Sequence, residues 1–190
     1  MLNTISDSKE TFYKEFPFVI PHVFRRVADE MLVELHLLSH QKNFKLDELS
    51  SLGITSAFKD LTKGYKPKDH LEKLFHAICI CNGYDASRIN NTALNKLDSS
   101  SKIKVNDIKS NFIEKTDNNL KIIFSSENKY YTRLTSIGIY KILENIIQKD
   151  SDNKSIDITE VTKEIGSDIG YSKDRIEKDI NLYLASVEKL

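Results

Sequence analysis

The chain has 190 residues, of which 39% are hydrophobic and 29% are charged, and its formal net charge is zero. This length allows one large domain with a sizeable core, and the balanced charge argues against a protein that binds nucleic acid. No apolar run approaches the roughly 18 residues that a membrane-spanning helix needs.

Two helices are predicted at the N-terminus, where apolar residues recur at helical spacing. The first is expected to be capped by Asp7, with Glu10 as its capping-box partner, and to end at Pro17. Pro21 favours the start of a second helix, because proline lacks an N–H that the first turn leaves unpaired. This second helix is predicted to run to about Lys42.

The next segments keep the helical period and are separated by glycine and proline. A third helix is predicted to end at Gly64, and a fourth should begin at Pro67 and stop at Gly83. A weaker helix follows Asp85, whose side chain suits an N-terminal cap. Residues 105–117 are also predicted to be helical. These breaks indicate a series of short helices joined by tight turns.

A long apolar helix and a final amphipathic helix are predicted towards the C-terminus. Residues 118–129 resemble a short strand in part, but a single strand would have no partner, so a helix end or loop is expected. Tyr130 to Gln148 form the long helix, and the polar residues 148–155 form a linker. The last helix should follow the turn at Gly170, be capped by Ser172 and carry a heptad-like seam of Ile176, Ile180, Tyr183, Val187 and Leu190.

That seam leaves two interpretations open. It can dock on the chain's own bundle, which is the usual outcome for a seam this short. It can instead form half of a coiled coil with a partner, in which case the 172–190 helix is a scaffold.

The second predicted helix carries three carboxylates, two adjacent arginines and two histidines beside a wide apolar face. When the residues are placed on a helix at 100° per residue, Glu34 falls inside the apolar face. A buried carboxylate there needs a partner of opposite charge, and Arg133 is the candidate for that partner. Val33 and Leu37 lie outside the main face. The helix is therefore expected to be covered on more than one side and to occupy a central position.

Charged residues of this helix are spaced for ion pairs at i and i+4, namely Arg25 with Asp29 and Arg26 with Glu30. The favoured interpretation is a charged network that fixes the register of the helix.

An alternative is a helical metalloprotein or enzyme that uses Glu30, Glu34, His36 and His40. The two histidines share a face, but that face is polar, and HLLSH lacks the glutamate of the H-E-x-x-H zinc motif. Solvated or capping histidines are therefore favoured.

Two cysteines, Cys79 and Cys81, are too close in sequence for a routine disulfide. Together with Glu72 and His76 they offer too few ligands on one face for zinc. Cys79 is expected to be an inert thiol on an apolar helix face rather than a nucleophile.

The pattern as a whole predicts an all-α protein, a single helical bundle of about seven to nine helices. Residues 1–150 are expected to form the bundle core, and residues 151–190 a C-terminal helical segment packed on it. No glycine-rich phosphate loop is present, and no catalytic, cofactor-binding or metal-binding constellation is visible.

Several long blocks of the sequence resemble the thylakoid-formation protein family, also described as a photosystem II biogenesis factor. The blocks are SDSKETFY, FRRVADEMLVELHLLSHQKNF, LSSLGITSAFKDLTKGYKP, YYTRLTSIGIYKILE and SKDRIEKDINLYLASVEKL. They occur in the family's order and cover most of the chain, whereas residues 85–130 match poorly.

The resemblance implies a non-enzymatic accessory protein, without cofactor, metal or nucleic acid, that acts in thylakoid organisation and in photosystem II assembly and repair. It implies association with the FtsH-type membrane protease and contact with photosystem II subunits. It also implies a place in the cyanobacterial cytoplasm, bound peripherally to the thylakoid membrane through such partners. Residues that match its blocks are candidates for structural or partner-binding roles: Arg25, Arg26, Glu30, Glu34, Gly64, Tyr65, Pro67, Arg133 and Gly138.

Overall fold

Eight α-helices and no strand make up the part of the chain that the structure describes, which is residues 3–105, 108, 123–128, 130–149 and 156–189 of a computed structural model. The helices are α1 (Ile5–Glu15), α2 (His22–His40), α3 (Glu48–Leu61), α4 (Lys68–Ile80), α5 (Ala86–Ser100), α8 (Arg133–Gln148), α9 (Ile158–Asp168) and α10 (Lys173–Val187). The predicted all-α fold class is confirmed.

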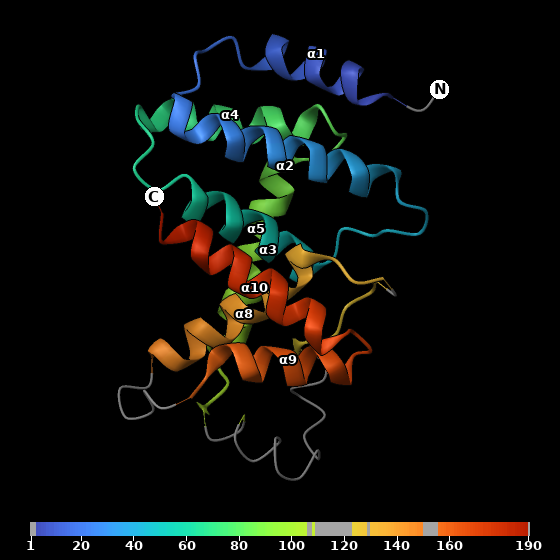
Figure 1. Cartoon of the computed structure of the whole chain (residues 1–190), viewed down its shortest axis with the longest axis vertical. Coiled ribbons are helices and arrows are strands. Elements are labelled where there is room, and N and C mark those ends of the chain that lie inside the picture. The colour runs from blue at the N-terminus through green and yellow to red at the C-terminus, as the bar shows by residue number, and fades with distance from the viewer. Residues whose placement is uncertain (1–2, 106–107, 109–122, 129, 150–155, 190) are drawn as a thin grey trace.

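The helices are stacked in layers along the long axis of the molecule (Figure 1). α1, α2 and α4 form one end, α9 lies towards the other, and α3, α8 and α10 lie between them. α3 and α8 form the most extensive helix pair, and α5, α9 and α10 pack around them. The centre of the bundle is therefore the crossing of α3 and α8.

At this crossing the two backbones touch because each helix has a glycine where the other passes. A Cβ atom added to Gly53 would lie 1.8 Å from the carbonyl oxygen of Leu134, and one added to Gly138 would lie 2.2 Å from that of Leu49. Neither position has room for any side chain, since backbone atoms cannot move aside as a flexible side chain can. The glycines thus set the distance between the two central helices.

A buried carboxylate fastens the loop before α8 to the start of α3. Asp47 caps α3 through the backbone N–H of Ser50 at 2.8 Å. It also accepts hydrogen bonds from the hydroxyl of Ser126 at 2.6 Å, the backbone N–H of Glu127 at 3.1 Å and the side-chain amide of Asn128 at 3.1 Å. No cation pairs with Asp47 among the described residues, and four hydrogen-bond donors compensate the cost of burying its charge.

The prediction that α2 is central is wrong. Val23 and Leu37 on this helix are 64% and 63% exposed, and α2 packs mainly on α4, α1 and α3. α1 and α4 cover one side of the helix, but the side facing α10 stays open to solvent. Leu37, outside the main face, therefore belongs to an exposed apolar surface rather than to a second layer of packing, whereas Val33 is partly buried. The helix ends at His40, slightly earlier than expected.

Most helix ends lie close to the predicted positions, with a correction at α1. Its N-cap is Thr4, and Asp7 is the capping-box partner rather than the cap, because Asp7 Oδ2 accepts the backbone N–H of Thr4 at 2.8 Å. Asp85 and Ser172 occupy the N-cap positions of α5 and α10 as predicted. Residues 123–128 form a helix end followed by a loop, as predicted for that part of 118–129, whereas most residues of the segments 105–117 and 148–155 lie outside the described part of the chain.

The heptad-like seam of α10 faces the chain's own bundle. Ile176 and Ile180 are fully buried and Tyr183 is 5% exposed, and α10 packs on α9, α8 and α3. Its central positions are therefore occupied by intramolecular contacts, which agrees with docking on the bundle.

Candidate functional site

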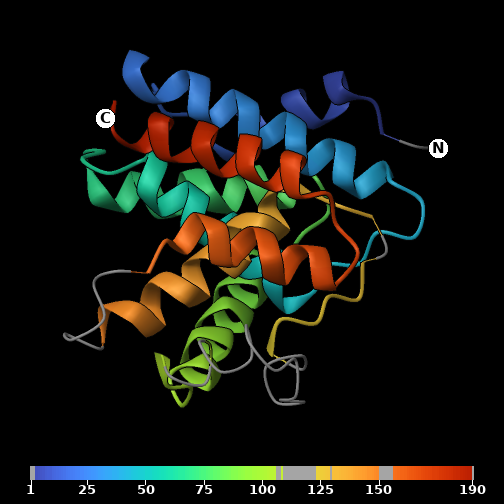
Figure 2. The same cartoon turned by 60° about the horizontal axis from the view of Figure 1, so that its bottom comes forward.

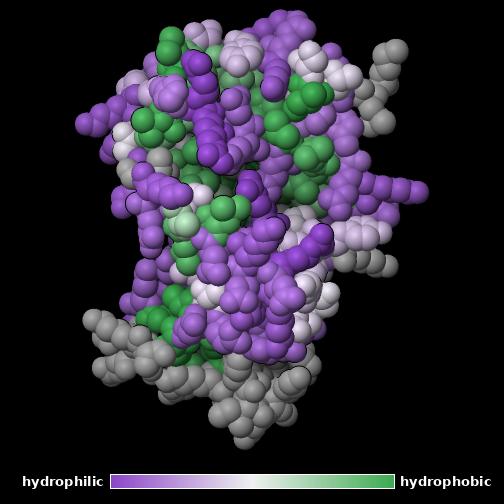
Figure 3. Space-filling model, viewed as in Figure 1, coloured by the Kyte–Doolittle hydropathy of each residue, from purple (hydrophilic) through white to green (hydrophobic). Residues whose placement is uncertain are grey.

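An amphipathic groove of about 770 Å³ runs along the surface between α2 and α10. The two helices run in roughly the same direction, next to each other in Figure 2 and with α3 between them in Figure 1. α3 and α8 form the apolar floor of the groove. We call it the α2–α10 groove, and its apolar lining comprises Val23, Val27, Met31, Val33 and Leu37 of α2, Ala57 and Leu61 of α3, Leu134 and Ile137 of α8, and Leu182 and Tyr183 of α10. On this face, Figure 3 shows hydrophobic side chains interspersed with hydrophilic ones.

An ion pair joins the α2 wall of the groove to its floor. Arg133, the first residue of α8, donates from Nε to both carboxylate oxygens of Glu34 at 2.8 Å, and its Nη2 also donates to Oε2. Glu34 is 19% exposed and Arg133 is 36% exposed at the side chain. Hydrogen bonding to Glu34 raises the pKa of Arg133 above its ordinary value. The predicted Glu34–Arg133 contact is therefore confirmed, and it holds α2 at a fixed position relative to α8.

The remaining charges of the groove are distributed over both walls. On α2, Arg26 donates from Nε to Glu30 at 2.7 Å as predicted, but this pair is largely solvent-exposed. On α10, Asp179 accepts the hydroxyl of Tyr131 at 2.7 Å. No ion pair joins Arg25 to Asp29 among the described residues, so that prediction is wrong: both side chains extend into solvent, where pairing gains little.

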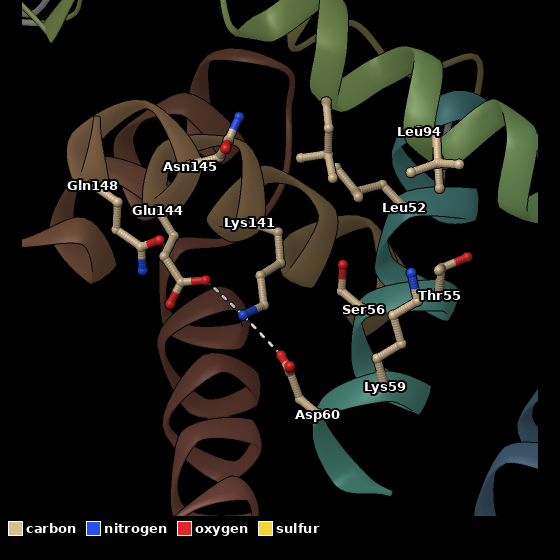
Figure 4. A pocket seen from close by; sticks show the side chains of 12 residues that line it. Leu52, Thr55, Ser56, Lys59, Asp60, Leu94, Lys141, Glu144, Asn145 and Gln148 are labelled. Carbon is tan, nitrogen blue, oxygen red and sulfur yellow. Dashed lines mark hydrogen bonds and ion pairs between the residues drawn. The ribbon is translucent and has the colours of Figure 1, made fainter. Parts of the chain in front are cut away.

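A second pocket of about 220 Å³ lies between α3, α5 and α8, and Lys141 reaches across it (Figure 4). Its Nζ lies 2.8 Å from Asp60 Oδ2 and 2.6 Å from Glu144 Oε2. Asp60 also accepts the hydroxyl of Tyr183. Burial alone would lower the pKa of Lys141, but its hydrogen bonds to the two carboxylates outweigh burial and raise it. Since a nucleophilic lysine needs a lowered pKa, this one is a structural cation linking α3 and α8.

His36 and His40 occupy different environments. His36 is 8% exposed and lies beneath α1, with its Nδ1 3.0 Å from the hydroxyl of Ser8. Burial lowers the pKa of His36, and the nearby charge of His40 adds to this effect. The prediction of a solvated or capping histidine is wrong here, because α1 covers what the helix alone presents as a polar face. His40 is exposed, and its Nδ1 lies 2.9 Å from the backbone oxygen of His36 in the last turn of α2.

The four residues of the enzyme or metalloprotein alternative do not form one site. Glu34 borders the groove, whereas His36 points to Ser8 on another side of α2. Residues two apart on a helix are separated by about 200°, which explains the division. Within the described residues, no group of three or more histidine, cysteine, aspartate or glutamate side chains is arranged to hold a metal ion.

Both cysteines are buried free thiols. Cys79 is fully buried and Cys81 is 3% exposed. Burial raises the pKa of Cys79 to about 12 and that of Cys81 to about 11. Such thiols are protonated and shielded at neutral pH, as predicted for Cys79.

Three of the candidate residues lie together where α3 turns into α4. Gly64 has a positive φ of 87°, and Pro67 is the N-cap residue of α4. Tyr65 is buried, and its ring centroid lies 5.1 Å from that of Phe24 on α2. Gly138 belongs to the α3–α8 crossing, and Arg25 is exposed on α2. The candidates are therefore spread over the groove, a turn and the core.

Sequence reasoning missed the α10 wall of the groove and one half of the glycine crossing. Asp179 and Leu182 lie between the seam positions of the last helix, and only their place in the groove of the folded chain draws attention to them. Gly53 stands within a strongly helical segment, where a glycine costs about 1 kcal/mol relative to alanine. A glycine placed inside a helix despite this cost was the available signal for a close backbone contact.

The bundle and its open groove define an all-helical protein with a surface suited to binding another molecule. A sequence profile of the thylakoid formation protein family matches residues 4–190. The chain is 44% identical to Protein Thf1 of Prochlorococcus marinus (strain NATL1A), over 98% of this chain and 90% of that protein. It is 36% identical to Protein Thf1 of Synechococcus sp. (strain CC9605), over 98% of this chain and 83% of that protein. The chain belongs to the thylakoid formation protein family.

A solved structure of Psb29 has the same fold. It matches with a TM-score of 0.77 and covers 98% of this chain and 97% of its own, at 23% sequence identity. The helical architecture thus persists although most side chains differ. Among the described residues, no helix combines the length and the apolar character needed to cross a membrane.

Proposed function

We propose that the protein is a non-enzymatic accessory factor in thylakoid biogenesis and in photosystem II assembly and repair, and that it acts by associating with an FtsH-type membrane protease. The observation that carries this proposal is the family match over residues 4–190. The family is named for thylakoid formation, and the resemblance of the sequence blocks adds the protease and photosystem II as partners.

The structure supports a role in binding rather than in chemistry. Glu34 and Lys141, the charged side chains best placed for a reactive role, are held in ion pairs. The α2–α10 groove exposes apolar side chains that a partner can cover. An accessory factor of this kind associates with the cytoplasmic face of the thylakoid membrane through its partners.

Co-purification from thylakoids tests the association. A tagged copy of the protein, expressed at its native level in a cyanobacterial host, is isolated from detergent-solubilised membranes. We expect enrichment of the FtsH-type protease over an untagged strain and over a strain that carries the same tag on an unrelated peripheral protein. Recovery of neither the protease nor a photosystem II subunit would remove the main support for the proposal.

Photosystem II repair in a deletion strain tests the physiological role. After exposure to high light, recovery of oxygen evolution should be slower than in the parent strain, and the abundance of the protease should change in parallel. Restoring the gene is the control. Normal recovery with unchanged protease abundance would contradict a role in repair.

A further inference from the structure

The linker between α1 and α2, together with the first turn of α2, presents apolar side chains to solvent. Val19 is 85% exposed, Val23 is 64% exposed and Phe18 is 36% exposed. They are three of the nine large apolar side chains that are exposed in the described part of the chain, and they fall within six consecutive residues. Exposed apolar side chains that gather in one place indicate an interaction surface, whereas isolated ones do not.

Buried neighbours hold this linker in a fixed conformation. Phe16 and Ile20, which flank the exposed residues of the linker, are 1% and 9% exposed. The ring of Phe18 lies against that of His70 on α4, with 4.0 Å between the ring centroids. The linker also contains two prolines, whose rings fix the backbone angle φ. The exposed apolar side chains are therefore preorganised, so less ordering is required when they are covered.

The turn between α3 and α4 lies at the same edge of the bundle as the start of α2 (left in Figure 1). The ring centroid of Phe24 on α2 lies 5.1 Å from that of Tyr65 in this turn. The Nζ of Lys73 on α4 lies 5.0 Å from the centroid of the Phe18 ring. The linker and the α3–α4 turn therefore form one continuous surface. We call its two segments, residues 16–26 and 62–68, the basic edge.

The basic edge has an excess of positive charge, although the formal net charge of the chain is zero. Its two segments contain no carboxylate and five cations, namely Arg25, Arg26, Lys63, Lys66 and Lys68. All five are exposed. Arg26 is paired with Glu30, and the other four cations form no ion pair among the described residues.

Carboxylates next to the two segments do not cancel this excess. Asp60 and Asp69 are each paired with a lysine, at 2.8 and 3.7 Å. Glu15 and Asp29 form no ion pair among the described residues, so four unpaired cations stand against two unpaired carboxylates. The local charge is therefore positive and attracts an anionic surface.

The composition of the basic edge favours a lipid surface over a protein partner. Three of its four unpaired cations are lysines, a residue type that is depleted at protein–protein interfaces. Lysines beside apolar side chains attract anionic lipid headgroups and require no fixed partner geometry. A side chain as exposed as Val19 can enter the boundary between headgroups and acyl chains without a matching hollow in a partner.

We propose that the basic edge binds directly to the surface of an anionic lipid bilayer, with Phe18 and Val19 inserted among the headgroups and the three lysines of the α3–α4 turn in contact with them. This inference goes beyond the proposed function, which requires only protein partners. Apolar insertion and basic charge together give reversible attachment, unlike the permanent anchoring of a membrane-spanning helix.

Co-sedimentation of the full chain with protein-free vesicles tests the contact. Vesicles of phosphatidylcholine with about one third phosphatidylglycerol should bind the wild-type chain, and pure phosphatidylcholine should bind it at least about tenfold more weakly. Raised salt should weaken binding to the anionic vesicles, because screening reduces the attraction. Equal binding to the two compositions, or binding to neither, would overturn the proposal.

A substitution in the linker tests apolar insertion. Val19→Glu should weaken binding to the anionic vesicles at least about tenfold, because a charge that the headgroups repel replaces the inserted side chain. Leu94→Glu is the matched control: Leu94 is 56% exposed on α5, outside the basic edge, so binding should change less than about twofold. Urea unfolding confirms that both variants keep the fold. Equal losses of binding would contradict insertion at Val19.

A double charge reversal tests the lysines. Lys63→Glu/Lys68→Glu should weaken binding at low salt at least about twentyfold, since each lysine near an anionic membrane contributes a factor of about five. Lys42→Glu/Lys102→Glu makes the same change in net charge at two exposed lysines outside the basic edge, and its effect should be about threefold or less. If the two double variants bind equally weakly, only the net charge matters and the assigned surface is wrong.

Fluorescence tests whether the linker enters the bilayer. Val19→Cys can be labelled selectively with an environment-sensitive maleimide dye, because Cys79 and Cys81 are buried with raised pKa values. Anionic vesicles should shift the emission of this dye to shorter wavelength, and spin-labelled lipid should quench it. The same dye at Leu94→Cys should show neither change. A bound chain whose dye at Val19→Cys stays in water would refute insertion.

Failure of this inference is distinguishable from failure of the proposed function. If the chain recovers the protease from solubilised thylakoids but does not bind protein-free anionic vesicles, the proposed function stands and the inference is wrong. If the chain binds the vesicles through Val19 but recovers no protease and no photosystem II subunit, the inference stands and the proposed function loses its main support. Loss of protease recovery in Val19→Glu, without any vesicle binding by the wild type, would assign the basic edge to a protein partner instead.

Discussion

Two pairs of neighbouring helices in this bundle differ in what lies between them. At the α3–α8 crossing, Gly53 and Gly138 let each helix touch the backbone of the other. Between α2 and α10, larger side chains border a groove of about 770 Å³. Because interface side chains set the separation of packed helices, the same secondary structure yields a closed core in one place and an open surface in the other. The first pair should therefore control stability, and the second binding.

The largest expected effect is at the closed crossing. Gly53→Ala places a Cβ atom 1.8 Å from a backbone oxygen, so it should lower the free energy of unfolding by about 3 kcal/mol or more, or prevent folding. Gly166→Ala is the control, because its Cβ would meet the flexible end of Ile176 at 2.2 Å. It should cost about 1 kcal/mol. Urea unfolding followed by circular dichroism measures both, and similar values would contradict a backbone-limited crossing.

A smaller loss is expected at the start of α3. Asp47→Ala removes both a helix cap and the acceptor of three further hydrogen bonds, so it should cost about 2–4 kcal/mol. Asp85→Ala removes only the exposed cap of α5 and should cost about 1 kcal/mol. Thermal unfolding measures both variants. Equal losses of stability in Asp47→Ala and Asp85→Ala would mean that the buried donors around Asp47 contribute nothing to stability.

Substitutions at the groove should affect stability less. Glu34→Ala leaves Arg133 without its half-buried partner, and we expect a loss of about 1–2 kcal/mol. Glu30→Ala breaks the exposed pair with Arg26 and should cost less than about 0.5 kcal/mol. Chemical denaturation distinguishes the two. A loss at Glu34 as large as that at Gly53 would abolish the contrast between the groove and the crossing.

The smallest effect is expected at His36 and appears only in acid. Burial lowers the pKa of His36 below its ordinary value of 6.5, so the folded state favours the neutral ring. The contribution of the neutral His36 ring to the free energy of unfolding is complete above pH 6.5. It is lost as the pH falls below that value, because the unfolded chain then binds a proton more readily than the folded chain does. Unfolding of wild type and His36→Gln at pH 7.5 and 5.5 checks this. The variant should lose less stability in acid, and identical pH dependence would contradict the assignment.

The fold class and several helix ends could be predicted because they depend on local signals. Proline, glycine and capping residues mark the turn at Gly64 and the starts of α5 and α10. The Glu34–Arg133 contact was also predictable, since a carboxylate within an apolar face needs a cation and the chain has few arginines.

The position of α2 and the burial of His36 could not be predicted, because helical periodicity shows which residues share a face but not which neighbour covers it. α1 covers His36, although that residue lies on what the helix alone presents as a polar face. Val23 and Leu37 lie on apolar surface that no described helix covers. The groove depends on where α10 lies relative to α2, which is a long-range arrangement with no local signal.

The glycine crossing also provides a way to recognise distant relatives. Each glycine accommodates the other helix's backbone, so a larger residue at one position cannot be offset by a smaller one opposite. An inserted residue within either helix would turn the glycine about 100° away from the contact, whereas the segment joining the helices can vary in length. A diverged sequence that retains both glycines, each within an apolar helix, can therefore be assigned to this architecture when little other similarity remains.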